Sequence, residues 1–430
     1  MKKTNIVIIV VDAFRPKNLS LFGYNKETDK NIKKIAKENV LFRRFFSTSN
    51  STTPALNSIF TGLYPSSHGV IHQFPYTSEE EIDKFETVKF WFPEYLKTKG
   101  YNTIAIDWIG MWFKRGFDYY EEKEEKESNL RKFMNMPLIK KLLLNLPNWA
   151  YKFGKGLVKT RASTPFVPCS ESINLAISKV KQARNPFFLF VHLWDTHFPF
   201  PTTKYRASGE ENVKEIIDNI KSVSQKEYVK KRITDINLNS VQDVINKYDL
   251  TIKNIDKEVG KFVKFLKKEK LWENTIFIVL GDHGDNITEH GIYFSHSGLY
   301  DESIHVPLIM HLPGIEAKEI NELAQNVDIL PTILEYLKEN TEEKFDGVSL
   351  LPLIIRGEKT RDKIFSWDGL SLDIKLVRTK DKKLIVAKNN TCNLCKSSHH
   401  KEIEEYDLLK DPQETRNIYS GESELMRFLK

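Results

Sequence analysis

The stretch that decides the fold is Glu273–Gly314, ENTIFIVLGDHGDNITEHGIYFSHSGLYDESIHVPLIMHLPG. It begins with an apolar run, Thr275–Leu280, of the kind that forms a central strand covered on both faces of a sheet. The polar pair Asp282 and His283 follows where this run ends. Neighbouring strand residues point to opposite faces, so these two side chains can share a ligand only if the chain turns, which the flanking glycines permit. Ligands of open α/β sheets bind beyond the carboxyl ends of the strands, so we expect a metal ion or an anion here.

A second acidic residue stands in the same position relative to another strand. Asn5–Val11 is a β-branched run that predicts a buried strand, and Asp12 follows it directly. No Gly-x-Gly-x-x-Gly motif comes next, which argues against a dinucleotide-binding fold. A single Asp after a strand is often only a helix cap. Its combination with Asp282 and His283 makes a metal site the better interpretation.

The totals describe a globular chain with a mixed surface. At 430 residues it can bury a large core and divide into two lobes. The 65 basic and 58 acidic side chains give a formal charge of +7, which mildly favours anionic substrates or membrane surfaces but predicts no nucleic-acid binding. Three cysteines form no disulfide framework. The apolar run after Met1 is too short for a signal peptide, and no stretch reaches the ~20 apolar residues of a membrane span, so we expect a cytoplasmic protein.

Further motifs share one family pattern. They are DHGD (282–285), EHG (289–291), His296, LYDE (299–302) and VPLI (306–309), then QNVDILPT (325–332), DGVSL (346–350) and the closing YDL, DP and ETRN (406–417). Together they resemble the sulfatase branch of the alkaline phosphatase superfamily. The resemblance extends from residue 5 to about residue 417.

The resemblance implies an α/β fold with a mostly parallel central sheet sandwiched by helices. It places a catalytic domain at 1–344 and a small C-terminal α+β lobe at 345–430. The least family-like part of the catalytic domain, at about 119–168, is interpreted from its composition as a basic amphipathic insert. In the C-terminal lobe, alternating apolar and polar residues predict antiparallel strands at 363–367, 374–378 and 383–386. Asp328 is expected to have a structural role as a helix cap.

The nucleophile of the family opens a helix in the motif Cys or Ser, then x-Pro-x-Arg. Counting back from Thr61-Gly62 places Thr52 at the nucleophile position, with Thr53 as the fallback if the register is off by one, and Leu56 where the family has Arg. Thr cannot be converted to formylglycine as Cys or Ser can. The family often has a Lys and a His shortly after the expected strand at 101–107, and in the run WIGMWFK at 108–114 they are not in their places. A threonine at this point resembles phosphodiesterases and the phosphoglycerol or phosphoethanolamine transferases.

The resemblance also implies the ligands of the ion. One divalent metal ion would be held by Asp12, Asp282 and His283, with the Thr52 hydroxyl as a fourth ligand. Oxygen ligands with one imidazole suit Mn or Zn, and Ca or Mg are alternatives. The ion would activate the hydroxyl for attack on the ester.

Two histidines are expected to contact the leaving group or the oxyanion. His197 takes the place of the family's Asp-Pro-His histidine, and His296 lies in the opening stretch. Asp195 would orient His197 or bind a second ion. Arg15 is interpreted as an ion-pair residue rather than an anion ligand, and His192 as a packed strand residue.

The leading hypothesis is a hydrolase of phosphate esters, of phosphodiesterase or phosphonate-ester type, or a phospho-group transferase. The alternatives are a sulfatase that works without formylglycine and a non-catalytic metal-binding protein. The partner would be an anionic ester, glycan-linked or lipid-linked, and the oligomeric state stays open. Lysines interleaved with apolar residues at about 130–160 suggest peripheral membrane contact, although packing on its own domain or on a second subunit is the stronger interpretation.

One cluster lies apart from these motifs. Cys392, Cys395, His399 and His400 are close enough in sequence to form a zinc site. The adjacent histidines do not have the usual spacing, so a hairpin tip with incidental cysteines is the favoured alternative.

Overall fold

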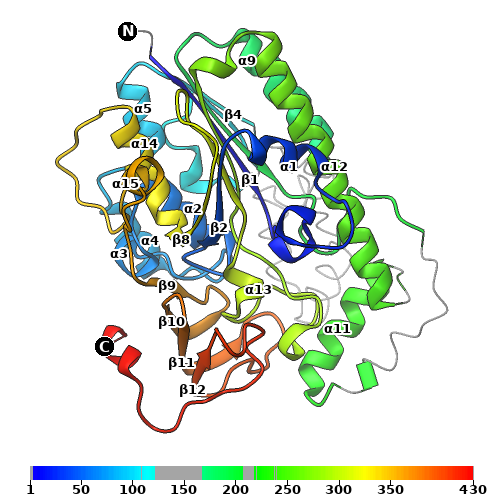
Figure 1. Ribbon diagram of the computed structural model, residues 1–430. Helices are drawn as coiled ribbons and strands as arrows, with labels where there is room; N and C mark the ends of the chain where they lie inside the picture. Colours follow the sequence, from blue (N-terminus) through cyan, green and yellow to red (C-terminus); the bar gives the residue numbers. More distant parts are fainter. Residues whose placement is uncertain are drawn as a thin grey trace, which may run out of the picture.

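The computed structural model describes residues 3–107, 109–121, 167–206, 217–218, 220–236, 238 and 240–429. Its centre is an eight-stranded sheet in the order β4-β3-β5-β1-β6-β7-β2-β8 (Figure 1). The strands are β1 Asn5–Val11, β2 Val40–Phe46, β3 Asn102–Ile106, β4 Tyr119–Glu121, β5 Phe187–Leu193, β6 Thr275–Gly281, β7 Leu308–His311 and β8 Lys318–Gln325.

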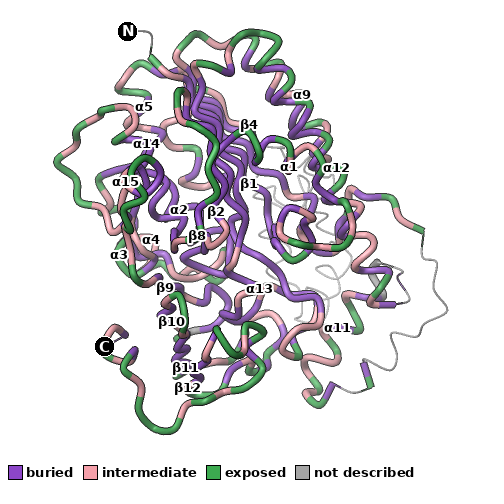
Figure 2. The backbone as a smooth tube through the Cα atoms, viewed as in Figure 1, coloured by how far each residue is buried: buried purple, intermediate pink, exposed green. Residues whose placement is uncertain are grey.

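All strands of this sheet run in one direction except β7, which is antiparallel to both β6 and β2. Strands β1, β5 and β6 are buried along their whole length, which explains their continuous apolar sequence. Figure 2 shows this buried centre between more exposed outer layers. The predicted mostly parallel sheet is confirmed.

Helices cover both faces of the sheet (Figure 1). On one face, α1, α9 and α12 pack with Ile32, Ile173 and Phe262 in one apolar cluster. On the other, α2, α5 and α14 contribute Leu56, Leu96 and Ile333 to a second cluster. The helices are α1 Lys30–Lys37, α2 Thr52–Thr61, α3 Pro65–His68, α4 Glu79–Glu86, α5 Phe92–Thr98, α9 Cys169–Gln182, α11 Val223–Ile236, α12 Val241–Lys268, α13 Asp301–Ile304, α14 Ile329–Tyr336 and α15 Leu351–Arg356.

A smaller antiparallel sheet follows, in the order β12-β11-β10-β9. Its strands are β9 Ile364–Trp367, β10 Ser371–Arg378, β11 Lys382–Cys392 and β12 Ile403–Asp407, so the predicted antiparallel C-terminal strands are confirmed. The fully buried Lys383 of β11 donates to Asp301 at 2.8 Å and lies 2.5 Å from Glu414. The pair with Asp301 joins the small sheet to α13 of the larger lobe. The boundary at residues 344 and 345 stays a prediction.

Asp328 has a structural role, but not quite the one predicted. Its side chain accepts from the N–H groups of Gln325 and Val348 and pairs with Arg361. It makes no side-chain cap for the helix α14 that follows it. The expected cap is found one turn earlier, because Asp328 and Gln325 form a capping box on the 3-10 turn Asn326–Asp328 that leads into α14.

Most of the predicted insert lies outside the described residues, including the whole stretch at 130–160 that suggested membrane contact. Within the part of the chain that is described, no helix is both long enough and apolar enough to span a bilayer.

Candidate active site

Asp12 and Asp282 come together because their strands are neighbours. Strands β1 and β6 pair in parallel, with Val11 opposite Gly281, so the residues that follow them lie side by side. The backbone N–H of Ala13 donates to Asp282 Oδ1 at 3.2 Å, which ties the two strand ends together. Both carboxylates are fully buried.

His283 is oriented by the turn that follows β6. Its Nδ1 lies 2.7 Å from the carbonyl of Gly284, and a carbonyl only accepts, so Nδ1 carries the proton. In the neutral ring the other nitrogen, Nε2, carries the lone pair; it lies 3.7 Å from Asp12 Oδ1 and 3.6 Å from Asp282 Oδ2. The turn requires glycine at 284, since a Cβ there would lie 2.0 Å from the carbonyl oxygen of Glu302.

Thr52 reaches this group from α2. It is the first residue of the helix, and its Oγ1 lies 3.2 Å from His283 Nε2. Thr53 instead donates its N–H to Gln73, and its Oγ1 accepts from Phe74. The structure thus brings Thr52, rather than the fallback Thr53, to the Asp–His group.

The electrostatics of this group suit a bound cation. Ligand atoms of Asp12, Asp282 and His283 lie within 4.8 Å of one another. Both oxygens of Asp12 and Oδ2 of Asp282 are buried without a hydrogen-bond partner among the described residues. Burial, and then the charges of Asp282 and Asp285, raises the pKa of Asp12 well above its usual value. A divalent ion would satisfy these oxygens and favour their charged form, so the residues present fit the metal that the sequence predicted.

His192 also faces the group, and the sequence interpretation missed this. Its Nδ1 lies 3.0 Å from Asp107, the residue after β3, and its Nε2 lies 3.9 Å from both Asp12 Oδ2 and Asp282 Oδ2. A carboxylate that holds one imidazole nitrogen leaves the other available as a metal ligand, a common arrangement in metal sites. His192 is packed in its strand, as expected, but packing does not account for its buried Nε2, which has no hydrogen-bond partner in the described part of the chain.

His197 and His296 are half-buried and lie beside His283. The His296 ring stacks on His283 with centroids 4.4 Å apart, and the rings of His197 and His296 are 6.2 Å apart. Each Nδ1 donates to a backbone carbonyl, at Phe198 and Asn50 respectively, so each Nε2 is an acceptor in the neutral ring. Burial, reinforced by the charge of Arg232, lowers the pKa of His197 to about 4.

Burial and the neighbouring His283 likewise lower the pKa of His296 well below its usual value. In the free protein both rings are therefore neutral bases. Protonating a leaving group, one of the roles predicted for them, would first require an anion bound nearby to raise their pKa values.

Arg232 of α11 is a second residue that the sequence interpretation missed. Its guanidinium lies over the Phe198 ring at 4.4 Å and the Tyr228 ring at 5.1 Å. Its Nε is buried and has no hydrogen-bond partner among the described residues. Its charge acts on His197 and on Asp285, although burial still raises the pKa of Asp285 to about 7. A half-buried guanidinium whose buried Nε has no partner among the described residues, and whose charge acts on His197, is suited to bind an anion.

The remaining predicted residues are held elsewhere. Arg15 pairs with Glu289 at 2.5 Å, as the ion-pair interpretation expected. Asp195 accepts from the N–H of Cys169 and from the Thr202 hydroxyl, so its Oδ1 fastens the loop after β5 to α9. Its predicted role in orienting His197 has no support in these contacts.

The comparisons with known proteins show the family of this chain. The family model "Sulfatase" matches residues 4–339, and "N-sulphoglucosamine sulphohydrolase, C-terminal" matches residues 288–428. The chain therefore belongs to the sulfatase family, within the alkaline phosphatase-like fold, and is an ester-hydrolysing enzyme. An arylsulfatase of Clostridium perfringens is 26% identical over 98% of this chain and 91% of its own length.

Solved structures share the fold across almost the whole chain. A phosphonate monoester hydrolase of Agrobacterium radiobacter has a TM-score of 0.65 with 18% identity, covering 97% of this chain and 91% of that one. A protein in complex with its substrate D-glucosamine-2-N,6-O-disulfate has a TM-score of 0.67 with 19% identity, covering 100% of this chain and 97% of that one. At these identities the likeness concerns the fold alone.

Proposed function

We propose that this enzyme cleaves phosphate or phosphonate esters, with Thr52 as the nucleophile. The observation that carries the proposal is the Thr52 hydroxyl, 3.2 Å from His283 Nε2 and at the start of α2. Threonine cannot supply the formylglycine of an orthodox sulfatase, but its hydroxyl can attack an ester once it is activated.

The residues that would hold the ion are Asp12, Asp282 and His283, with the Thr52 hydroxyl beside them. His192 is a fifth group within reach. Mixed oxygen and imidazole ligation favours Mn or Zn, with Ca or Mg as alternatives. When bound, the ion favours the ionised form of the hydroxyl and neutralises an oxygen of the ester.

The other residues bind the ester and move protons. Arg232 would hold an ester oxygen, in place of the missing family Lys and His. Thr52 Oγ1, whose proton passes to solvent, attacks phosphorus; the bond from phosphorus to the leaving oxygen breaks, and a phosphothreonine is formed. His197 or His296, protonated once the anion is bound, then donates from Nε2 to that leaving oxygen. As a neutral base it afterwards takes a proton from the water or acceptor hydroxyl whose oxygen attacks phosphorus. The bond from phosphorus to Thr52 Oγ1 then breaks, and Oγ1 regains a proton from solvent.

The test is a panel of nitrophenyl phosphate, phosphodiester, phosphonate and sulfate esters, assayed with Mn²⁺, Zn²⁺, Ca²⁺ and Mg²⁺. We expect phosphorus esters to be preferred. Thr52→Ala should lower kcat by at least about a thousandfold, as loss of a nucleophile does, whereas Thr53→Ala should retain most of the activity. Preference for the sulfate ester, or full activity of Thr52→Ala, would contradict the proposal.

A sulfuric ester hydrolase that works without formylglycine is the second candidate. The family match and the sulfatase-named relatives favour it. One observation speaks against a sulfatase. The family's Arg position is occupied by Leu56, which is fully buried in the apolar cluster under α2. For either activity the substrate class would be an anionic ester, and a sulfated or phosphorylated glycan is the form that the neighbour bound to a glucosamine disulfate suggests.

A further inference from the structure

The turn after β11 gathers three metal-ligating side chains outside the candidate active site. The N–H of Cys392 donates to the carbonyl of Ser397 at 3.0 Å, and the N–H of Lys396 donates to the carbonyl of Cys392 at 2.9 Å. A bridge pairs Thr391 with Ser398. These bonds form the predicted hairpin tip, and they fold Cys395 back toward Cys392.

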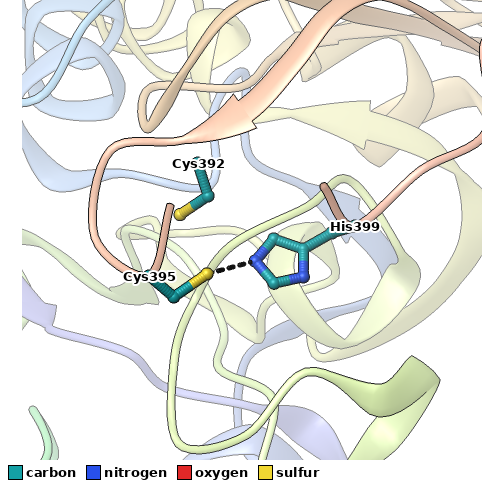
Figure 3. A group of neighbouring side chains, drawn as sticks. All are labelled: Cys392, Cys395 and His399. Atoms are coloured by element: carbon teal, nitrogen blue, oxygen red, sulfur yellow. Dashed lines mark hydrogen bonds between the residues drawn. The ribbon is translucent and has the colours of Figure 1, made fainter. Parts of the chain in front are cut away.

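The three side chains face one another, as Figure 3 shows for Cys392, Cys395 and His399. Cys395 Sγ lies 3.0 Å from His399 Nε2, and all three ligand atoms lie within 4.8 Å of one another. Both thiols are buried. His400 is engaged elsewhere, because its Nδ1 pairs with Glu404 at 2.7 Å and its Nε2 accepts from the N–H of Leu299.

We propose that Cys392, Cys395 and His399 bind a zinc ion that is separate from the active-site metal. Two thiolates and one imidazole are a typical ligand set for zinc. The fourth position falls to water or to the hydroxyl of Ser297, whose Oγ lies 3.2 Å from Cys392 Sγ. A disulfide between Cys392 and Cys395 is the alternative. It would not explain why His399 Nε2 lies 3.0 Å from Cys395 Sγ.

The zinc ion would stabilise two segments that carry residues of the candidate active site. Ser297 follows His296 directly, so the cluster abuts the segment that carries this histidine. On its other side the tip contacts the start of α11, because the hydroxyl of Ser224 donates to the carbonyl of Lys396 at 3.3 Å and lies 3.0 Å from Ser397 Oγ. The same helix carries Arg232. Zinc at the tip would thus fix both His296 and Arg232 relative to Thr52.

The decisive experiment measures zinc in a chain whose active-site ligands are removed. The Asp12→Asn/Asp282→Asn variant of the full-length protein is purified in the presence of zinc and then desalted. It should retain about one equivalent of zinc per chain, measured by inductively coupled plasma mass spectrometry. Adding Cys395→Ser or His399→Ala should remove it. Adding Cys169→Ser should not, since this third cysteine is buried near Asp195, away from the tip. Cobalt in place of zinc should give a near-ultraviolet charge-transfer band that depends on Cys395.

A second measurement needs no substitution at the tip. A mercurial that titrates thiolates should release the retained zinc from the folded chain, detected with a metallochromic dye. Three results would overturn the proposal. They are zinc that is retained after Cys395→Ser, no zinc in the active-site variant, and an intact mass lower by two hydrogens, which would show a disulfide between Cys392 and Cys395.

Discussion

Replacing Asp12 by Asn should make the metal-free protein more stable, although it removes a proposed metal ligand. The carboxylates of Asp12 and Asp282 are fully buried, and their ligand atoms lie within 4.8 Å of each other. Two charges at that separation repel by about 3 kcal/mol at an effective dielectric constant of about 20. An Asn amide removes the repulsion and can donate to Asp282. We expect a net gain of about 1–3 kcal/mol in the free energy of unfolding.

With metal, the wild type should be stabilised more than the variant. A ligand at a hundredfold excess over its Kd stabilises the native state by about 2.7 kcal/mol. The entropy of unfolding of a chain this long is about 0.9 kcal/mol/K, so this corresponds to a rise of about 3 °C in Tm for the wild type. The variant should gain much less, because one of its three principal ligands has lost its charge.

The assay is thermal unfolding followed by circular dichroism, in EDTA and with excess Mn²⁺ or Zn²⁺. Asp256→Asn is the matched control, since this buried carboxylate does have partners: it accepts from the N–H groups of Asn31 and Ile32 and from the Asn31 amide. That substitution should destabilise the protein equally with and without metal. A metal-free Asp12→Asn protein that unfolds below the wild type, or an undiminished response to metal, would refute the reasoning.

The stability of the metal-free protein should fall as the pH rises, because the charge of Asp12 is unfavourable there. The pKa of Asp12 is raised, by burial and by its acidic neighbours, so its charge destabilises the metal-free fold as pH rises through that raised pKa. Protons compete with the ion for the same carboxylate. Stabilisation by metal should therefore fade as pH falls through the same range, as metal titrations at a series of pH values would show.

Three further substitutions test single contacts. His192→Gln should weaken metal binding about 10- to 100-fold, measured by metal titration of Tm. Arg232→Met should lower kcat/KM roughly 10- to 150-fold, the value of a charged hydrogen bond, with Tm unchanged and partial recovery in Arg232→Lys. Glu81→Gln should cost about 1–3 kcal/mol at pH 7 in urea unfolding. Burial opposes the charge of Glu81, but bonds from His72 and nearby N–H groups lower its pKa to about 2, so this difference should narrow as pH falls from 4.5 toward 2.

The central sheet could be predicted because its strands are buried on both faces and therefore read as apolar runs. The expected strand at Thr275–Leu280 corresponds to β6, and Asn5–Val11 to β1. Strand β12 was not predicted, because its sequence IEEYD carries three acids in five residues. Glu404 and Glu405 are nevertheless buried. The partner that compensates Glu404, His400, is set by the fold of the preceding turn and not by the local pattern.

Site residues could be predicted where they belong to a sequence motif. They could not be predicted where their position depends on how the strands pair in the sheet. Asp12, Asp282 and His283 end strands in recognisable motifs. His192 sits inside an apolar run, and its meaning depends on pairing with Val10 of β1, which puts it on the same face as Asp12 two residues on. Arg232 lies among lysines on α11, and only the tertiary fold distinguishes it from its neighbours.

The sheet order itself explains why the charges gather. Strands β3, β5, β1 and β6 are consecutive neighbours in the sheet and run parallel. Their carboxyl ends bring together four polar side chains, those of Asp107, His192, Asp12 and Asp282. The four side chains are buried at that end of the sheet, and the mutual repulsion of the carboxylates opposes folding. A cation relieves that repulsion, and it does so within reach of the Thr52 hydroxyl. In this fold the cost of gathering the carboxylates and the capacity to activate a nucleophile have the same origin.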